Sequence, residues 1–324
     1  MKIAILGTGA YGLSLALMAN ENNSNIVMWT KFEEEKKVLI ENQGNPKLLP
    51  NVKMPSNIEY TTDMKKCVEN SDIILIMVPA GVVDDVSKEL KNYYNNQYIC
   101  IGSKGIEQDS CLFAADVVMK HIKTDKLSVI SGPSFAVDIA SYVPIGLSLA
   151  SNDEITGEIV KKALENKYLK IRTSDDILGV EICGSIKNII AIACGIVDGM
   201  GLPESTKAML ITEAMHDIKE LIHSLGGNKK TILSYAGIGD LILTCTSTKS
   251  RNFSFGRLIG SQVSKEEVDT YVSSTTIEGL YTLKSIYKLL RDKEVDMPII
   301  DIMYQIIVEN ADITLLTKFL VAKK

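Results

Sequence analysis

One lysine lies in the middle of an apolar helical segment, where its amine could exchange a proton with a ligand. Val180–Met200 has the sequence VEICGSIKNIIAIACGIVDGM, with Lys187 and Asn188 as the polar pair near its centre. In an apolar cleft the pKa of a lysine is lowered, so that the amine acts as acid or base near neutral pH. Such a group can take the proton of an alcohol or return it. The structural alternative is a lysine that pairs with Glu181 or extends outward to water.

A second chemical signal is the glycine motif Gly7-Thr8-Gly9-Ala10-Tyr11-Gly12 near the N-terminus. It follows a short β-branched strand and precedes a helix expected over Leu13–Asn20, which is the context that a G-x-G-x-x-G motif requires. Glycines at Gly7, Gly9 and Gly12 permit a tight turn, so that backbone N–H groups reach a pyrophosphate at the positive end of the helix. The motif therefore predicts a dinucleotide site rather than a plain strand–helix turn.

The end of the second expected strand indicates which dinucleotide is bound. An NAD site places Asp or Glu there to accept from the ribose 2′-OH. Here the strand ends Met28-Trp29-Thr30-Lys31, without a carboxylate, and Lys31 could meet a 2′-phosphate. Glu33 lies close enough to keep NAD open. We therefore expect NADP, with NAD as the alternative.

Two further polar clusters follow strands of the N-terminal half. Lys104, in SKGIE, follows the fourth expected strand, and Ser134, in SGPSFA, follows the fifth. Because the carboxyl ends of such strands border the ligand crevice, Lys104 could attract a phosphate or carboxylate and Ser134 could donate to a ligand. The alternatives are a solvated lysine and a serine that caps a helix.

The C-terminal half carries a third cluster. Asp240, flanked by Gly239, and the run Ser250-Arg251-Asn252 lie in its longest irregular stretch. Arginine binds phosphate through a fork of donors, so this stretch suits a charged ligand. Asp240 as a helix cap and Arg251 in water are the alternatives.

The elements that must position these residues divide the chain into two domains. Strands alternate with helices up to about Thr173, and several strands are apolar without alternation, which predicts a doubly wound α/β domain of Rossmann type. After it, only helical segments are expected, and Met297-Pro298 fits a helix start. We place a dinucleotide-binding domain at 1–174 and an all-helical substrate domain at 175–324. The expected elements are strands over 3–6, 26–29, 73–78, 98–101, 127–131 and 145–150, and helices over 177–197, 206–225, 265–272, 280–290 and 298–309.

Composition excludes several classes of protein. A net charge of -5 without a basic block argues against nucleic acid as partner. The six cysteines form no C-x-x-C pair, so we expect reduced, buried thiols and no metal. Glycines interrupt the apolar N-terminus, unlike a signal peptide, and Glu181 and Lys187 make the long apolar segment a poor membrane span. A soluble cytoplasmic protein without membrane insertion is expected.

The motifs in their order resemble those of the bacterial type of NAD(P)-dependent glycerol-3-phosphate dehydrogenase. The resemblance covers residues 1–317 and rests on GTGAYG, SKGIE, SGPSFA, GSIKNIIAI, AGIGDLILTCTSTKSRN and Ile277-Glu278-Gly279. It implies reduction of dihydroxyacetone phosphate to sn-glycerol 3-phosphate with NAD(P)H, as a supply for glycerophospholipid synthesis. It also implies a homodimer.

The resemblance implies roles for individual residues. Lys187 is the general acid/base, and Lys104 and Asp240 flank the reacting centre. The substrate site comprises Lys104, Gly132, Ser134, Lys187, Asp240, Ser250, Arg251 and Asn252. Beside the glycine loop of Gly7, Gly9 and Gly12, the cofactor positions are Ala10, Tyr11, Lys31, Lys104, Ala136, Arg251 and Glu278.

Two stretches depart from the family pattern, and two rival functions remain. Leu202-Pro203-Glu204-Ser205 replaces a usual Gly and Asn, and Glu213 stands where a basic residue is usual. One rival is another hydroxy-acid or ketopantoate-type dehydrogenase, which should lack the Arg251–Asn252 phosphate grip. The other is an NADP-sensing protein without turnover.

Overall fold

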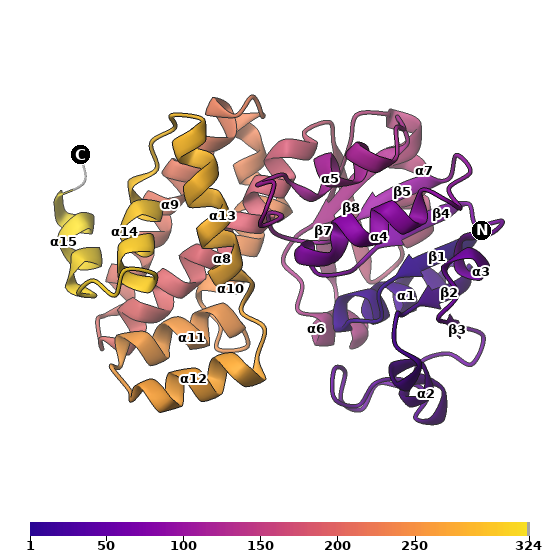
Figure 1. Ribbon diagram of the computed structural model, residues 1–324, viewed down its shortest axis with the longest axis horizontal. Helices are drawn as coiled ribbons and strands as arrows, with labels where there is room; N and C mark the ends of the chain where they lie inside the picture. The colour runs from indigo at the N-terminus through magenta and orange to yellow at the C-terminus, as the bar shows by residue number, and fades with distance from the viewer. Residues whose placement is uncertain (323–324) are drawn as a thin grey trace. The chain divides into compact units, whose positions relative to one another are not determined.

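The apolar runs of the N-terminal half form one eight-stranded sheet in the computed structural model, which describes residues 1–322 (Figure 1). All six predicted strands are present: β1 (Lys2–Leu6), β2 (Asn25–Trp29), β4 (Ile73–Ile76), β5 (Tyr98–Ile101), β6 (Leu127–Ser131) and β7 (Ile145–Ser151). Two further strands were not predicted: β3 (Glu59–Thr61) and β8 (Leu169–Ser174). Both lie at the edges of the sheet, and exposed residues interrupt them, so neither forms an apolar run.

The strand order is β3-β2-β1-β4-β5-β6-β7-β8. All neighbours pair in parallel except β6 and β7, which are antiparallel. The first six strands have the 3-2-1-4-5-6 order of the Rossmann fold, which confirms the predicted fold class. The order reverses direction at β1 and β4, so the ligand crevice is expected beyond the carboxyl ends of these strands.

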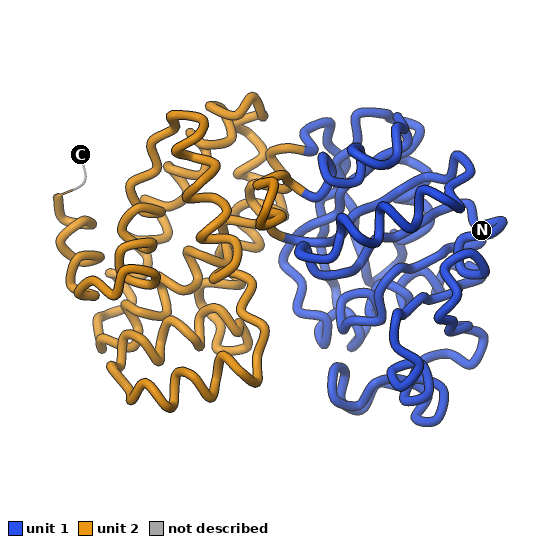
Figure 2. Tube along the Cα trace, viewed as in Figure 1, with its two compact units in different colours: residues 1–104, 114–177 blue, residues 105–113, 178–324 orange. Residues whose placement is uncertain are grey.

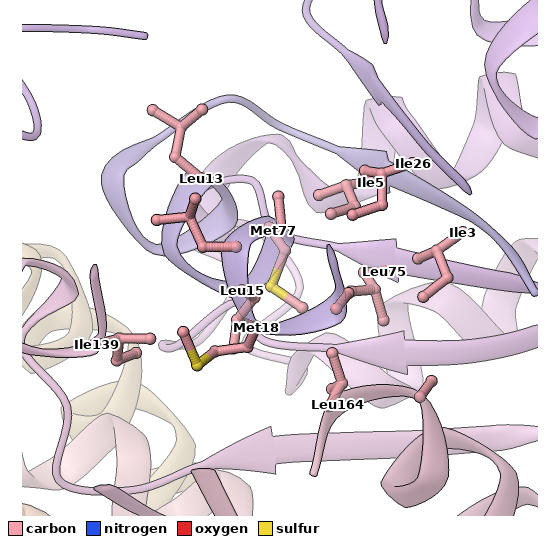
Figure 3. Packing of buried hydrophobic residues seen from close by; sticks show 14 of the residues in the cluster. Ile3, Ile5, Leu13, Leu15, Met18, Ile26, Leu75, Met77, Ile139 and Leu164 are labelled. Carbon is pink, nitrogen blue, oxygen red and sulfur yellow. The ribbon is translucent and has the colours of Figure 1, made fainter. Parts of the chain in front are cut away.

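Helices cover both faces of the sheet, as right-handed crossovers require. On one face, α1 (Ala10–Glu21), α6 (Ala136–Ala140) and α7 (Glu154–Leu164) share a core with alternate strand residues. Ile3 and Leu75 of the strands and Leu13 and Ile139 of the helices belong to this cluster (Figure 3). Burying each such side chain stabilises the fold by about 1.5–3 kcal/mol. The other connections are α3 (Met64–Val68), η1 (Ala80–Val82), α4 (Val83–Leu90) and α5 (Ala114–His121), with α2 (Glu33–Glu41) between β2 and β3.

The chain forms two compact units, shown in different colours in Figure 2. The first comprises residues 1–104 and 114–177 and contains the sheet. The second comprises residues 105–113 and 178–324 and contains the remaining helices. The short segment 105–113, which follows Lys104, thus packs with the helical unit and closes on itself through a bridge between Ile106 and Phe113.

The helical unit contains the five predicted helices: α8 (Ile177–Gly199), α9 (Glu204–Ser224), α12 (Lys265–Ser274), α13 (Glu278–Asp292) and α14 (Pro298–Ile307). The prediction of an irregular stretch around Asp240 and Arg251 is wrong. This stretch forms the 3-10 helix η2 (Lys229–Leu233), the π-helical turn η3 (Tyr235–Gly239) and the helices α10 (Asp240–Cys245) and α11 (Arg251–Gly260). A last helix, α15 (Thr314–Ala322), was not predicted.

Glycines let the backbones of α8 and α11 touch. A Cβ atom at Gly256 would lie 2.0 Å from the carbonyl oxygen of Ile192, and one at Gly195 would lie 2.1 Å from that of Phe253. Only glycine therefore fits at these contacts. α8 is long and apolar enough to cross a membrane, but the most apolar 18 residues of this helix are all buried within the protein.

Candidate active site

The glycine loop after β1 is shaped by close backbone contacts. Gly7 has φ +114°, and a Cβ atom there would lie 2.7 Å from the carbonyl oxygen of Met77. A Cβ atom at Gly12 would lie 2.6 Å from the carbonyl oxygen of Gly7, whereas one at Gly9 would meet nothing within 4 Å. The first and third glycines are thus required by the fold. The second faces open space, so a ligand could approach the main chain at Gly9.

The amino terminus of α1 is suited to an anion. Its first residues are Ala10 and Tyr11, its N-cap Gly9 provides no side-chain cap, and no acidic residue lies in the first turn. The positive end of the helix dipole is therefore not neutralised locally. The hydroxyl of Thr8, in the same loop, is buried without a hydrogen-bond partner among residues 1–322. These features fit a pyrophosphate group.

Lys31 is exposed directly after Thr30 at the end of β2. Glu33, which kept NAD open in the sequence, accepts from Lys36 at 2.7 Å and from the Thr62 hydroxyl. The hydrogen bond from Lys36, followed by that from Thr62, holds the pKa of Glu33 below its usual value. Glu33 is therefore engaged by neighbours within the protein.

The segments that follow β1, β5 and β6 lie close together beyond the carboxyl ends of these strands. The Lys104 ammonium lies 5.7 Å from the centre of the Tyr11 ring and donates a long hydrogen bond, 3.5 Å, to the carbonyl oxygen of Gly132. The Ser134 hydroxyl donates to the same oxygen at 3.1 Å. Lys104 is partly buried, unlike a solvated loop lysine, and α6 begins at Ala136 without a side-chain cap. Ser134 is therefore not the cap of α6, and Lys104 contacts Tyr11 and Gly132.

Lys187 is buried in α8 and forms an ion pair. Its side chain is 9% exposed, and its ammonium donates to Asp240 Oδ1 at 2.5 Å and to the Thr244 hydroxyl at 3.2 Å. The Thr244 hydroxyl in turn donates to the main-chain oxygen of Asp240 at 2.6 Å. The structure shows Asp240 as a partner of Lys187, whereas the sequence had suggested Glu181. The small exposed fraction of the Lys187 side chain contradicts a lysine that extends outward to water. The pair is also more polar than the apolar cleft that we expected.

The position of Asp240 follows from the local fold. η3 precedes it, and the Ser234 hydroxyl accepts from the main-chain N–H of Gly237 at 3.2 Å within that turn. Asp240 is the first residue of α10, where a carboxylate is favoured by the helix dipole. Thr244 lies four residues later and hence on the same face of the helix. α10 thus presents both side chains to Lys187.

A chain of amide hydrogen bonds joins α8, α11 and α13. Asn188 Nδ2 donates to Glu278 Oε2 at 3.0 Å, and Asn252 Nδ2 donates to Asn188 Oδ1 at 3.0 Å. The main-chain N–H of Gly279 donates to Asn252 Oδ1 at 2.9 Å. Both asparagine side chains are therefore held by the protein itself. Since Asn188 and Asn252 are buried, these bonds also satisfy polar groups that would otherwise cost stability.

Ser250 and Arg251 open α11. The Ser250 hydroxyl is the N-cap and accepts from the main-chain N–H of Phe253 at 3.2 Å. Arg251 is exposed, and its carbonyl oxygen accepts from the Tyr271 hydroxyl at 3.1 Å. Arg251 is therefore an exposed cation in the first turn of a ten-residue helix, where the helix dipole also favours an anion such as phosphate.

The predicted site residues divide between the two compact units. Printed contacts join Tyr11, Lys104, Gly132 and Ser134 in the sheet unit, Lys187 with Asp240 in the helical unit, and Asn252 with Glu278 through Asn188. The other predicted residues of the sheet unit are Gly7, Gly9, Ala10, Gly12, Lys31 and Ala136, and those of the helical unit are Ser250 and Arg251. Sequence reasoning missed the contributions of Asn188 and Thr244. Two signals could have found them: Thr244 lies four residues after Asp240, and a buried asparagine such as Asn188 requires a hydrogen-bond partner.

The departure at Leu202–Ser205 has a structural consequence. Glu204 begins α9 and accepts from the buried Lys207 ammonium at 2.8 Å, while Asp198 accepts from it at 2.6 Å. Burial lowers the pKa of Lys207, but the hydrogen bonds to Asp198 and Glu204 outweigh it, so the pKa is raised. Glu213, the second departure, is partly buried on α9. The altered residues thus take part in the packing of α9.

All six cysteines are free and buried, as predicted. Burial raises the pKa of Cys67 and of Cys100 to about 12, so neither thiol is reactive near neutral pH. Within residues 1–322, no group of three or more His, Cys, Asp and Glu side chains could hold a metal ion.

A Rossmann sheet with an open glycine loop, together with a helical unit that buries a lysine–carboxylate pair, defines the class of the protein: a nicotinamide-dinucleotide-dependent dehydrogenase. Sequence models of the two parts of NAD-dependent glycerol-3-phosphate dehydrogenase match this chain, the N-terminus at residues 2–156 and the C-terminus at residues 176–318. The chain belongs to the NAD-dependent glycerol-3-phosphate dehydrogenase family.

Known proteins agree with this assignment. Glycerol-3-phosphate dehydrogenase [NAD(P)+] of Staphylococcus haemolyticus is 35% identical over 313 residues, which are 95% of this chain and 94% of the relative. The crystal structure of glycerol-3-phosphate dehydrogenase from Coxiella burnetii has a TM-score of 0.94 and 32% identity, covering 99% of each chain. A ketopantoate reductase of Ralstonia eutropha, with a TM-score of 0.58, 14% identity and coverage of 99% and 100%, shares the fold alone.

Proposed function

We propose that this chain interconverts dihydroxyacetone phosphate and sn-glycerol 3-phosphate with NAD(P)H. Residues 1–174 would bind the dinucleotide and residues 175–324 the substrate. The observation that carries the proposal is the buried Lys187–Asp240 pair, which offers a proton at a fixed position in a chain of this family. The glycine loop and the exposed Arg251 account for the other two requirements, a dinucleotide site and a phosphate grip.

Lys187 is the proton donor in the direction of reduction. When bound, NAD(P)H would supply the hydride for C2 of the substrate. The carbonyl π electrons move to the oxygen, and the Lys187 ammonium transfers one proton to that oxygen to complete the alcohol. Asp240, at 2.5 Å, stabilises the ammonium form before transfer, and Thr244 restricts the direction of Nζ.

The substrate phosphate calls for donors that remain charged. Arg251 offers a planar fork at the start of α11, and Lys104 offers a second cation beside Gly132 and Ser134. Asn252 keeps its predicted place in the substrate site, and its hydrogen bonds give it a second role. Because it is hydrogen-bonded to Asn188 and to Gly279, we assign it the role of fixing the start of α11.

The cofactor site uses the glycine loop and the start of α1 for the pyrophosphate. Ala10 and Tyr11 supply the first turn, and Ala136 belongs to α6, which packs on α1. Lys31, exposed after β2, supports NADP because it can pair with a 2′-phosphate. Glu278 accepts from Asn188, and we propose that it and Arg251 complete the cofactor site.

The assay is oxidation of NADH and NADPH, followed by absorbance, with dihydroxyacetone phosphate as substrate. We expect Lys187→Met to lose at least about 10²-fold in kcat, the usual contribution of a general acid, with cofactor affinity kept. Lys207→Met is the matched control, because Lys207 is also buried and paired with carboxylates in the helical unit. Equal turnover in the Lys187 variant and the wild type would remove Lys187 from the mechanism. Turnover only on hydroxy acids without phosphate would replace the proposed substrate.

We also propose that the chain acts in the cytoplasm as a homodimer and supplies glycerol 3-phosphate for glycerophospholipid synthesis. The support is the resemblance to the bacterial family and the burial of the apolar helix α8. Light scattering of the purified chain measures the assembly: a mass of twice 35.6 kDa supports the dimer, and a mass of 35.6 kDa refutes it.

A further inference from the structure

The structure brings a carboxylate to the end of β2, where the sequence has none. Thr30, which follows the last residue of β2, stands at the position that Asp or Glu occupies in an NAD site. Its hydroxyl donates to Glu35 Oε2 and accepts from the main-chain N–H of Phe32 at 3.3 Å. Glu35, in the first turn of α2, is thus folded back onto the strand end.

Three glutamates open α2, and only Glu35 keeps an uncompensated charge. Glu33 pairs with Lys36 at 2.7 Å, and Glu34 pairs with Lys37 at 3.0 Å. No lysine or arginine among residues 1–322 forms an ion pair with Glu35. The side chain of Glu34 is 85% exposed, whereas Glu35 is partly buried against the strand end.

We propose that Glu35 is the acceptor for the ribose 2′-OH of NAD(H), and that it opposes Lys31, which favours the 2′-phosphate of NADP(H). This rests on the proposed function only for the identity of the cofactor. A carboxylate accepts from a hydroxyl and repels a phosphate, whereas a lysine attracts the phosphate. The cofactor preference is then set by the balance of Glu35 and Lys31, so that a chain without an acidic residue at the strand end still accepts NAD(H).

The test measures binding without catalysis. ADP-ribose and its 2′-phosphate carry the adenosine end of the two cofactors without nicotinamide, and calorimetry gives the dissociation constant of each for the full chain. For Glu35→Gln, the ratio of the two constants should shift by roughly five- to tenfold toward the phosphorylated ligand, the scale expected for one charge several ångströms from a phosphate. Lys31→Met should shift it in the opposite direction.

Glu34→Gln is the matched control, since it removes the same charge one residue away on the same helix. Its ratio should change less than about twofold, because exposed charges are screened. An equal shift in the Glu34 and Glu35 variants, or an unchanged ratio in Glu35→Gln, overturns the assignment. The second result would leave Glu35 with the purely structural role of bonding to Thr30, which glutamine also fulfils.

Thr30→Val is a second route to the same answer, because it removes the donor that holds Glu35 and should shift the ratio in the direction of Glu35→Gln. A shift toward ADP-ribose would contradict the proposal. The result of this binding test can be told apart from the result of the dihydroxyacetone phosphate assay. A chain that fails to reduce dihydroxyacetone phosphate but shows the Glu35 shift would lose the proposed substrate and keep the cofactor assignment.

Discussion

Asp240→Asn separates the charge of the buried ion pair from its shape. The amide keeps an oxygen near the Lys187 ammonium but removes the opposite charge at 2.5 Å. At an effective dielectric constant of about 20, that attraction is about 7 kcal/mol, and the cost of desolvating both groups offsets part of it. Breaking a buried pair by removing one partner costs about 3–5 kcal/mol. Because the amide still accepts a hydrogen bond, we expect a loss of about 3 kcal/mol in the free energy of unfolding.

Thermal and denaturant unfolding give the measurement. With about 2–4 °C per kcal/mol for a unit of this size, the midpoint of the helical unit should fall by about 6–12 °C. The control is Asp301→Asn, because Asp301 pairs with Arg291 at 2.9 Å through side chains that are 30% and 59% exposed. A surface pair of this kind contributes at most about 1 kcal/mol. If the Asp240 variant unfolds no earlier than the Asp301 variant, the buried pair is not the stabilising feature that the geometry indicates.

A double-mutant cycle with Lys187→Met isolates the pairing itself. Once the ammonium is removed, the carboxylate of Asp240 loses its partner, so the second substitution should cost much less than it does in the wild type. We expect the double variant to be more stable than the sum of the single variants predicts, by about 2 kcal/mol or more. Additive effects would mean that the two side chains contribute independently.

Three further outcomes are expected. Gly256→Ala should lower the free energy of unfolding by more than about 2 kcal/mol, because its Cβ atom would lie 2.0 Å from a carbonyl oxygen of α8. Gly157→Ala in α7 has no contact closer than 3.8 Å, so in denaturant unfolding it should raise the same free energy by about 0.5–1 kcal/mol. Arg251→Lys should raise KM for the phosphorylated substrate at least tenfold with a smaller change in kcat, since a lysine cannot form the fork. Hydrogen bonds from His121 and then Lys120 lower the pKa of Asp84. The ionised Asp84 therefore stabilises the fold above about pH 4, and this effect is lost as the pH falls through the lowered pKa. In urea unfolding, the destabilisation caused by Asp84→Asn should therefore shrink below about pH 4.

The sheet could be predicted because parallel strands buried on both faces are continuous apolar runs. β3 and β8 lack such runs, since exposed residues interrupt both. α10 and α11 were missed for a different reason. Their stretch is rich in glycine, serine and threonine, and its helices are fixed by caps such as Ser250 and by contact with α8, which periodicity does not report.

The candidate site was also predictable only in part. Lys104 and Ser134 could be located because each follows a predicted strand, and the carboxyl ends of such strands border the ligand crevice. The partner of Lys187 could not be found in this way, since Asp240 lies 53 residues further along the chain and is brought near by tertiary packing. Glu35 was missed because its hydrogen bond to Thr30 depends on how α2 folds back on β2.

The glycine contacts of α8 and the polar contacts beside them are one structural feature. Asn188 and Asn252 meet at 3.0 Å only because α8 and α11 approach until backbone atoms touch at Gly195 and Gly256. A methyl group at either glycine would push the helices apart and lengthen that hydrogen bond, leaving buried amides unsatisfied. The start of α11, which carries Arg251, would move with it. The close packing of α8 therefore contributes to the stability of the helical unit and fixes the position of Arg251.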